Sequence, residues 1–300
     1  MTVEVANSSI AEDMDRVNRQ IARRQKINSM VRYVLLIAVG FVMLYPLIWL
    51  VGASFKTNSE IFTNPGFWPK EPTISGYVKG WQTSTPYTFG HFFWNTFLII
   101  LPKTIGTCIS ASLVAYGFAR FEFPFKRVFF SLLIATLLLP NVVTRIPQYL
   151  LFRDMGWLDT FLPLWVPSAL AGDAFFTFML VQFLRGIPRD MEEAARVDGA
   201  NSLQTLWYIV TPLLAPALIS VALFQFMWTM NDFLGPLIYL SSVDKFPVSL
   251  ALKLSIDTTE AFDWNQILAM SVLAITPALI VFFMAQKYFI EGISTGGVKG

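Results

Sequence analysis

Six apolar segments, each long enough to cross a lipid bilayer, constrain this chain more than any other feature. A transmembrane helix needs about 20 consecutive residues that are mostly apolar. The segments are Tyr33–Phe55, Phe92–Ala119, Val128–Phe152, Thr160–Leu184, Trp207–Met230 and Trp264–Gln286. Because backbone N–H and C=O groups cannot stay unpaired in lipid, each segment must be a helix. We therefore expect an all-α polytopic membrane protein with six transmembrane helices.

Composition agrees with a membrane protein and excludes several other classes. Of the 300 residues, 55% are hydrophobic and only 14% are charged, which is outside the range of soluble domains. The net charge of +2 is too small to suggest nucleic-acid binding. With one cysteine, Cys108, and one histidine, His91, neither an internal disulfide nor a His/Cys zinc cluster can form. The chain has no GxxxxGK[ST] motif, so ATP used for transport would be hydrolysed by another chain.

The distribution of lysine and arginine between the segments predicts the orientation. If the N-terminus is cytoplasmic, the cytoplasmic side receives fourteen of these residues: Arg16, Arg19, Arg23, Arg24, Lys26, Arg32, Arg120, Lys126, Arg127, Arg185, Arg189, Arg196, Lys287 and Lys299. The outer side receives six: Lys56, Lys70, Lys79, Arg153, Lys245 and Lys253. Since basic residues gather on the cytoplasmic side, we expect both termini to be cytoplasmic.

The first 30 residues have a helical pattern of their own. Ile10, Met14, Val17 and Ile21 recur at helical spacing, and the basic residues of this region lie on the opposite face. This pattern predicts a cytoplasmic amphipathic helix, which could lie on the membrane surface or contact a partner subunit. Residues 31–55 then form the first transmembrane helix, and residues 56–90 form an extracytoplasmic segment.

A polar stretch, Arg189–Pro212, separates two of the apolar segments. Pro188 suits the first turn of a helix, and Glu192 and Glu193 suit its N-terminal dipole, with Glu192 placed to pair with Arg196. Asp198-Gly199 is a helix stop, because glycine adopts a left-handed conformation at little cost. Asn201 and Ser202 are N-cap types that would start a second helix. The stretch is either a small rigid docking element or an ordinary polar connector.

Three charged residues lie inside apolar segments: Lys103, Arg145 and Asp173. Such residues usually face a cavity or a partner charge. They could line a translocation path, or Asp173 could pair with Lys103 or Arg145 and join two helices. Arg145 could also extend to the outer surface. A secondary transporter that used these charges as a proton relay is the main alternative function.

Trp228, Asn231 and Asp232 close the fifth apolar segment at its outer end. An aromatic ring beside amide and carboxylate groups can stack on a sugar and hydrogen-bond its hydroxyls. Tryptophan is equally common as an interfacial anchor, and Asn-Asp commonly ends a helix. A membrane-embedded enzyme is a further alternative, but the segments contain no candidate nucleophile, metal site or carboxylate pair.

The polar stretch resembles the EAA loop of ABC-importer permeases. Glu193-Ala194-Ala195 is followed after three residues by Gly199, and Ile209-Val210-Thr211-Pro212 follows after nine more. The chain departs from the family pattern at Thr211, where leucine is usual. The resemblance implies that Glu193, Ala194, Ala195, Asp198 and Gly199 couple the chain to a cytoplasmic ATPase.

Further motifs are similar to carbohydrate-importer permeases of the maltose type. They are Ser54-Phe55-Lys56-Thr57 with Glu60, Asn231-Asp232-Phe233 with Pro236-Leu237, and the tail that ends at Gly300. The chain resembles the shorter six-span permease of the pair, with a type I ABC-importer permease fold, a core domain at 91–286 and a coupling loop at 185–206.

The same resemblance implies the partners and the location of the chain. The partners are a second permease, a homodimeric or paired ATPase that holds ATP and magnesium, an extracytoplasmic solute-binding protein and a carbohydrate substrate. No cofactor is expected in this chain, which would cross the cell (inner) membrane. The tail at 287–300 would contact the ATPase through Gly296, Gly297 and Lys299, and its glycines argue against a helix there unless a partner orders it.

Overall fold

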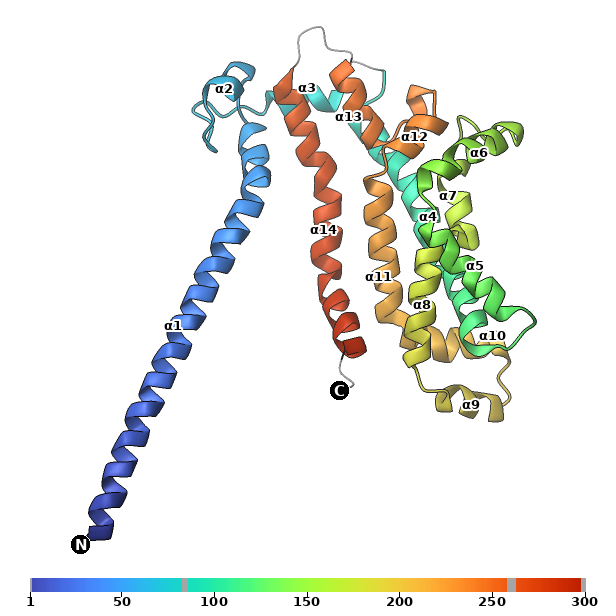
Figure 1. Ribbon diagram of the computed structural model, residues 1–300. Coiled ribbons are helices and arrows are strands. Elements are labelled where there is room, and N and C mark those ends of the chain that lie inside the picture. The colour runs from blue at the N-terminus through green and yellow to red at the C-terminus, as the bar shows by residue number, and fades with distance from the viewer. Residues whose placement is uncertain (1, 83–85, 258–262, 298–300) are drawn as a thin grey trace. The chain divides into compact units, whose positions relative to one another are not determined.

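A computed structural model describes the backbone of residues 2–82, 86–257 and 263–297 (Figure 1). The described backbone forms helices and no strand, as expected for an all-α protein. The chain divides into two compact units, Met1–Pro72 and Thr73–Gly300.

The first unit is built on one long helix, α1 (Thr2–Ala53). Its apolar part, Arg23–Ala53, is long enough to cross a membrane. No break occurs at residue 30, where the sequence suggested a boundary between a surface helix and the first span. Since an existing helix extends more easily than a new one nucleates, the polar N-terminal residues continue the apolar span.

The segment that follows α1 is folded around two charged side chains. Lys56 is fully buried, and its Nζ donates to the carbonyls of Asn64 at 2.7 Å and Gly66 at 2.5 Å. Glu60, in α2 (Asn58–Thr63), accepts from Asn64 Nδ2 at 2.8 Å and from the Lys70 N–H at 2.6 Å. The motif that begins at Ser54 therefore organises this loop.

The second unit contains the remaining helices. They are α3 (Ser75–Gln82), α4 (Phe89–Arg120), α5 (Lys126–Leu138), α6 (Asn141–Asp154), α7 (Leu162–Pro167), η1 (Ser168–Gly172), α8 (Ala174–Gly186), α9 (Asp190–Val197), α10 (Ser202–Thr205), η2 (Leu206–Val210), α11 (Thr211–Met230), α12 (Leu234–Tyr239), η3 (Val243–Lys245), α13 (Val248–Asp257) and α14 (Trp264–Gly297). Across the described residues of both units, five helical runs are long and apolar enough to span a membrane, and a bent pair makes up to six.

The bent pair corresponds to the expected third span, Val128–Phe152. α5 and the part of α6 from Val142 to Asp154 differ in direction by 104°. The expectation that this segment is a single helix is wrong here, and the cause is local. Pro140 has no backbone N–H and holds Leu139 in an extended conformation, with φ −75° and ψ 124°.

The expected fourth span, Thr160–Leu184, is also discontinuous. α7 and the π-helical turn η1 end where Leu170 and Ala171 leave helical geometry, and α8 begins at Ala174. Ala171 has φ +62°, an uncommon value for a residue with a Cβ atom. Its N–H donates to Ser110 Oγ of α4 at 3.1 Å. Contact with α4 therefore supports the break.

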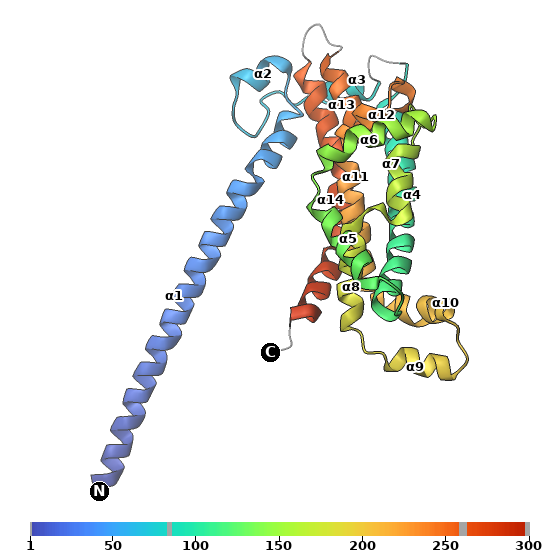
Figure 2. The ribbon, with the colours of Figure 1, turned by 45° about the vertical axis from the view of Figure 1, so that its right-hand side comes forward.

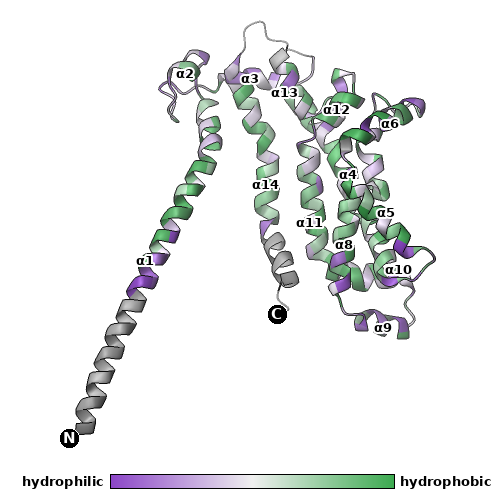
Figure 3. Cartoon of the chain, in the orientation of Figure 1, coloured by the Kyte–Doolittle hydropathy of each residue, from purple (hydrophilic) through white to green (hydrophobic). Residues whose placement is uncertain are grey.

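α4, α8 and α11 enclose the main core of this unit. Buried residues include Ala111 and Ala115 of α4, Leu180 of α8, and Leu214 and Val221 of α11. Ala111 and Ala115 are small, and small residues let helices in a bilayer approach closely. Apolar residues dominate α4, α8 and α11, and polar residues gather in α9 (Figure 3).

The connecting elements of this unit lie at opposite ends of the bundle. α3, α6, α12 and α13 lie at one end, and α9 and α10 lie at the other (Figures 1 and 2). This separation agrees with the sequence analysis, in which successive connections between the apolar segments lie on opposite sides of the membrane.

At the α12 end, Asp159 joins two loops. Its carboxylate accepts from the N–H groups of Ser241 and Ser242 at 3.0 Å each, and from Lys245 Nζ at 2.9 Å. Burial acts to raise the pKa of Asp159, but hydrogen bonds from Ser242, Ser241 and Lys245 outweigh it and hold the pKa below its ordinary value. Because the folded pKa is lowered, this stabilisation is present above the ordinary aspartate pKa and is lost in acid.

α14 continues to Gly297, so the expectation that the glycine-rich tail would not be helical is wrong up to that residue. Each glycine costs about 1 kcal/mol in a helix, but extending α14 requires no new nucleation. Lys299, a candidate ATPase contact, lies outside the described residues.

Candidate translocation cavity and coupling loop

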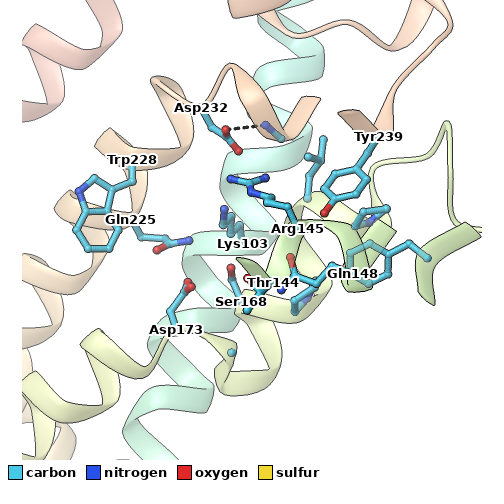
Figure 4. Close-up of a pocket in the computed structure, with 16 residues that line it drawn as sticks. Lys103, Thr144, Arg145, Gln148, Ser168, Asp173, Gln225, Trp228, Asp232 and Tyr239 are labelled. Carbon is cyan, nitrogen blue, oxygen red and sulfur yellow. Dashed lines mark hydrogen bonds between the residues drawn. The ribbon is translucent and has the colours of Figure 1, made fainter. Parts of the chain in front are cut away.

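A cavity of about 420 Å³ opens between α4, α6, the α7–α8 break, α11 and α12 (Figure 4). Its polar lining comes from separate parts of the sequence: Lys103, Thr144, Arg145, Gln148, Ser168, Asp173, Gln225, Trp228, Asp232 and Tyr239. Five of the six residues that the sequence suggested for a translocation path or for sugar contact therefore meet in one place.

The exception is Asn231. It is exposed and lines a different hollow, with Met227, Ser249 and Ser271. Its Nδ2 donates to the Met227 carbonyl at 2.8 Å, as a residue at a helix end does. For Asn231 the geometry favours the helix-end interpretation that the sequence left open.

The cavity holds two cations, Lys103 and Arg145, and two carboxylates, Asp173 and Asp232. Within the part of the chain that the structure describes, no ion pair of 4.0 Å or less joins any of the four. Asp232 Oδ1 instead accepts from the Gly235 N–H at 3.0 Å, at the start of α12 (Figure 4). In this structure the intramembrane charges line a cavity and do not form the direct pair that was the alternative.

Two buried oxygens in the cavity wall accept no hydrogen bond from any described residue. They are Asp173 Oδ2 and Gln225 Oε1, and Gln225 is only 1% exposed. A buried acceptor without a donor costs about 1–3 kcal/mol of stability. Such groups are rare in folded proteins and often mark a functional site. Both oxygens belong to residues that line the cavity, so a rotation of either side chain would present its oxygen to the hydroxyl groups of a ligand.

Trp228 supplies an aromatic surface beside these acceptors. Its ring packs against Phe175 and Phe176, with centroids 5.4 and 5.0 Å apart, and half of the residue remains exposed. The phenylalanines fix the ring, and its free part can contact an apolar sugar face. The cavity thus combines hydrogen-bond acceptors, cations and an aromatic surface.

α4 holds the broken helix that carries Asp173. A Cβ atom built on Gly106 would lie 2.4 Å from Ala169 Cβ, so only glycine allows this approach. Thr107 Oγ1 donates to the Ser168 carbonyl at 3.3 Å, and Ser110 accepts from Ala171 as described above. α4 therefore fixes the position of the cavity wall.

Gln225, Gln148, Thr144 and Tyr239 were not singled out from the sequence. An amide inside an apolar span is costly in lipid and usually faces a cavity or a partner. Gln225 and Gln148 could therefore have been predicted from the sequence as cavity residues. Tyr239 could not have been predicted in this way, because tyrosine is common at the ends of spans.

The second candidate site is the coupling loop, at the opposite end of the bundle. The expected short helix is α9, which ends before Gly199 at φ +86°. Asn201 caps α10: its side chain accepts from the Gln204 N–H at 2.9 Å, and Gln204 Oε1 accepts from the Asn201 N–H at 2.8 Å. The helix, the left-handed glycine and the N-cap expected from the sequence are all confirmed.

Glu192 does not form the surface pair with Arg196 that its spacing suggested. It is 2% exposed, and its Oε1 lies 2.6 Å from Nε of Arg120, the last residue of α4. Arg120 also donates to the Ile187 carbonyl at 3.0 Å, and Tyr116 OH donates to Glu192 Oε2 at 3.5 Å. A buried ion pair thus attaches α9 to a transmembrane helix. Helix spacing could not predict this contact, because the two residues are far apart in the sequence.

The rest of the loop faces outward. Glu193, Ala194, Asp198 and Gly199 are exposed, whereas Ala195 packs into the protein. Val197 is 88% exposed, although it is apolar. Glu192 and Ala195 therefore attach the loop, and the other residues are available to a partner.

Thr211, which departs from the EAA pattern, has a structural explanation. Its hydroxyl donates to the Leu206 carbonyl at 2.8 Å, across the π-helical turn η2. Leucine could not make this bond.

Comparison with known proteins assigns the family. Residues 108–295 match the family described as the binding-protein-dependent transport system inner membrane component. The chain belongs to this family. The permease is therefore a multi-pass transport subunit, and the secondary-transporter alternative does not apply to it.

Individual proteins agree with this assignment. A probable ABC transporter permease protein from Pyrococcus horikoshii is 32% identical over 85% of this chain and 92% of its own length. The arabinooligosaccharides transport system permease protein of Halalkalibacterium halodurans is 30% identical over 87% of this chain and 93% of its own length. A chain in the crystal structure of a bacterial ABC transporter for the acidic polysaccharide alginate matches with a TM-score of 0.74 and 26% identity, over 89% of this chain and 98% of that one.

Proposed function

We propose that the permease carries sugars or oligosaccharides through the cavity around Asp173 and Gln225, as one subunit of an ATP-driven importer. The observation that carries this proposal is the pair of unpartnered buried oxygens beside Trp228. A sugar offers hydroxyl donors for the oxygens and an apolar ring face for the indole. The relatives named for arabinooligosaccharides and alginate support the same class.

The proposal includes the partners and the mode of coupling. A second permease completes the path, an extracytoplasmic binding protein delivers the sugar, and a separate ATPase pair holds ATP and magnesium. The ATPase contacts the exposed residues of the coupling loop, which are Glu193, Ala194, Asp198 and Gly199. Ala195 packs into the protein and holds them in place. Gly296, Gly297 and Lys299 make a second ATPase contact. Alternating access, and no covalent step, moves the substrate.

Replacing Gln225 tests the cavity. We expect Gln225→Leu to lower ATP-driven uptake of arabinooligosaccharides at least tenfold in proteoliposomes that contain the complete transporter, because a ligand hydroxyl loses its acceptor. The same change should leave thermal stability equal or higher, since it removes an unsatisfied buried oxygen.

Thr177→Val is the matched control. Thr177 is 1% exposed and its Oγ1 also lacks a partner, but it does not line the cavity. Uptake in this control should equal that of the wild type. Normal uptake by Gln225→Leu would show that the cavity is not part of the sugar path. Uptake driven by a proton gradient without ATP would contradict the whole proposal.

The orientation belongs to the same proposal: both termini and the coupling loop are cytoplasmic, in the cell (inner) membrane. Starting from Cys108→Ser, a cysteine placed at the exposed Ser202 should react with an impermeant thiol reagent only from the cytoplasm. A cysteine at the exposed Ser241, at the opposite end of the bundle, should react only from outside. The reverse pattern would invert the proposed topology.

A further inference from the structure

A second hollow of the bundle, of about 500 Å³, lies apart from the central cavity. Its lining combines aromatic rings, three cations and one carboxylate: Phe118, Glu122, Phe123, Phe125, Lys126, Arg127, Phe130 and Arg185. We call this group the interfacial pocket. It shares no lining residue with the central cavity and includes none of Glu193, Ala194, Asp198 and Gly199, the residues proposed to contact the ATPase.

Aromatic rings form the wall of the interfacial pocket. The rings of Phe118 and Phe130 have centroids 5.6 Å apart, and Phe123 extends the group at 5.7 Å from Phe118. The Arg185 guanidinium carbon lies 5.1 Å from the Phe130 ring centroid, within cation–π range. The ring therefore holds Arg185 at the pocket without neutralising its charge.

The pocket has an excess of positive charge. Lys126 Nζ is engaged, at 2.9 Å from Glu122 Oε1 and 2.7 Å from the Phe121 carbonyl. Arg127 and Arg185 form no ion pair of 4.0 Å or less with a carboxylate among the described residues. Two arginines are thus available to an anion.

The pocket lies where the ends of three helices meet. α4 ends at Arg120, α5 begins at Lys126 and α8 ends at Gly186, at the same end of the bundle (Figure 2). Ends of membrane spans lie at the level of lipid headgroups. On α5, Val128, Phe129 and Leu132 are each more than half exposed and continue from the pocket along the span.

We propose that the interfacial pocket binds an anionic phospholipid. The phosphate contacts Arg127 and Arg185, and the acyl chain lies along Phe118, Phe130 and the exposed apolar side chains of α5. A phospholipid fits better than a free anion, because the aromatic wall offers contact area that inorganic phosphate cannot use. Basic pockets between helix ends are suited to acidic headgroups.

Binding of phosphatidylglycerol to the intact transporter tests this proposal. Spin-labelled phosphatidylglycerol, in phosphatidylcholine vesicles that contain the complete complex, should be enriched at the protein relative to spin-labelled phosphatidylcholine. Arg127→Ala and Arg185→Ala should each weaken this selectivity about fivefold, which is the usual value of one cation near a headgroup.

Two variants separate this role from a folding defect. Glu122→Gln should strengthen phosphatidylglycerol binding, because it removes a negative charge and releases Lys126; the Glu122 side chain is 87% exposed, so the fold should not change. Arg153→Ala should have no effect, because Arg153 lies in α6 and pairs with Asp154.

Equal enrichment of both lipids would overturn the proposal. Unchanged selectivity in both arginine variants would overturn it as well. Displacement of phosphatidylglycerol by millimolar inorganic phosphate would show that the pocket is a simple anion site and not a lipid site. Absence of binding in the complete complex would show that a partner subunit covers the pocket.

Discussion

Arg120→Ala should detach the coupling helix from the membrane domain and abolish transport. The substitution leaves Glu192 as a buried carboxylate without its cation, and removes the donor to the Ile187 carbonyl. Both side chains of the pair are 4% exposed or less, so water cannot replace the lost partner. Breaking one side of such a pair costs about 3–5 kcal/mol.

Thermal unfolding of the purified transporter and ATP-driven uptake measure the two consequences. Glu193→Gln is the stability control, because Glu193 is the neighbouring carboxylate of α9 but is exposed. It should leave the unfolding temperature unchanged. The double variant Arg120→Met with Glu192→Leu should recover much of the lost stability, since it leaves no buried charge. An Arg120→Ala protein as stable as the wild type would contradict the attachment role.

Gly106→Ala should destabilise the permease by about 1–3 kcal/mol, the usual cost of an added buried methyl group without space. The new Cβ would lie 2.4 Å from Ala169 Cβ and 2.9 Å from Ala169 Cα, so the α7–α8 break must move away from α4. Because Asp173 follows that break, uptake should fall with stability. Differential scanning fluorimetry and uptake assays measure both effects.

Gly117→Ala is the matched control on the same helix. A Cβ atom at Gly117 would meet nothing within 4 Å. The substitution should therefore be neutral or stabilise α4 by up to about 1 kcal/mol, through helix propensity alone. Equal effects of the two substitutions would show that the contact between Gly106 and Ala169 does not position the cavity.

Much of this architecture could be predicted from the sequence, because the physical rules involved act over short distances. Unpaired backbone groups are not tolerated in lipid, so the apolar segments had to be helices. Gly199 and Asn201 determine the turn after α9, since left-handed backbone and N-capping depend on one or two residues. The break at Pro140 follows from the same kind of rule, although the apolar character of the segment concealed it.

Only the tertiary structure decided which distant residues meet. Glu192 could have paired with Arg196 by helix spacing, yet it pairs with Arg120, 72 residues away, because α9 folds back against the end of α4. Ala171 has a left-handed backbone that its own residue type disfavours, and a contact with Ser110 of α4 supports it. Lys103, Arg145, Asp173 and Gln225 form one cavity because four separate helical segments converge there. Short-range backbone preferences fix the elements, whereas contacts between elements depend on how side chains pack across the whole bundle.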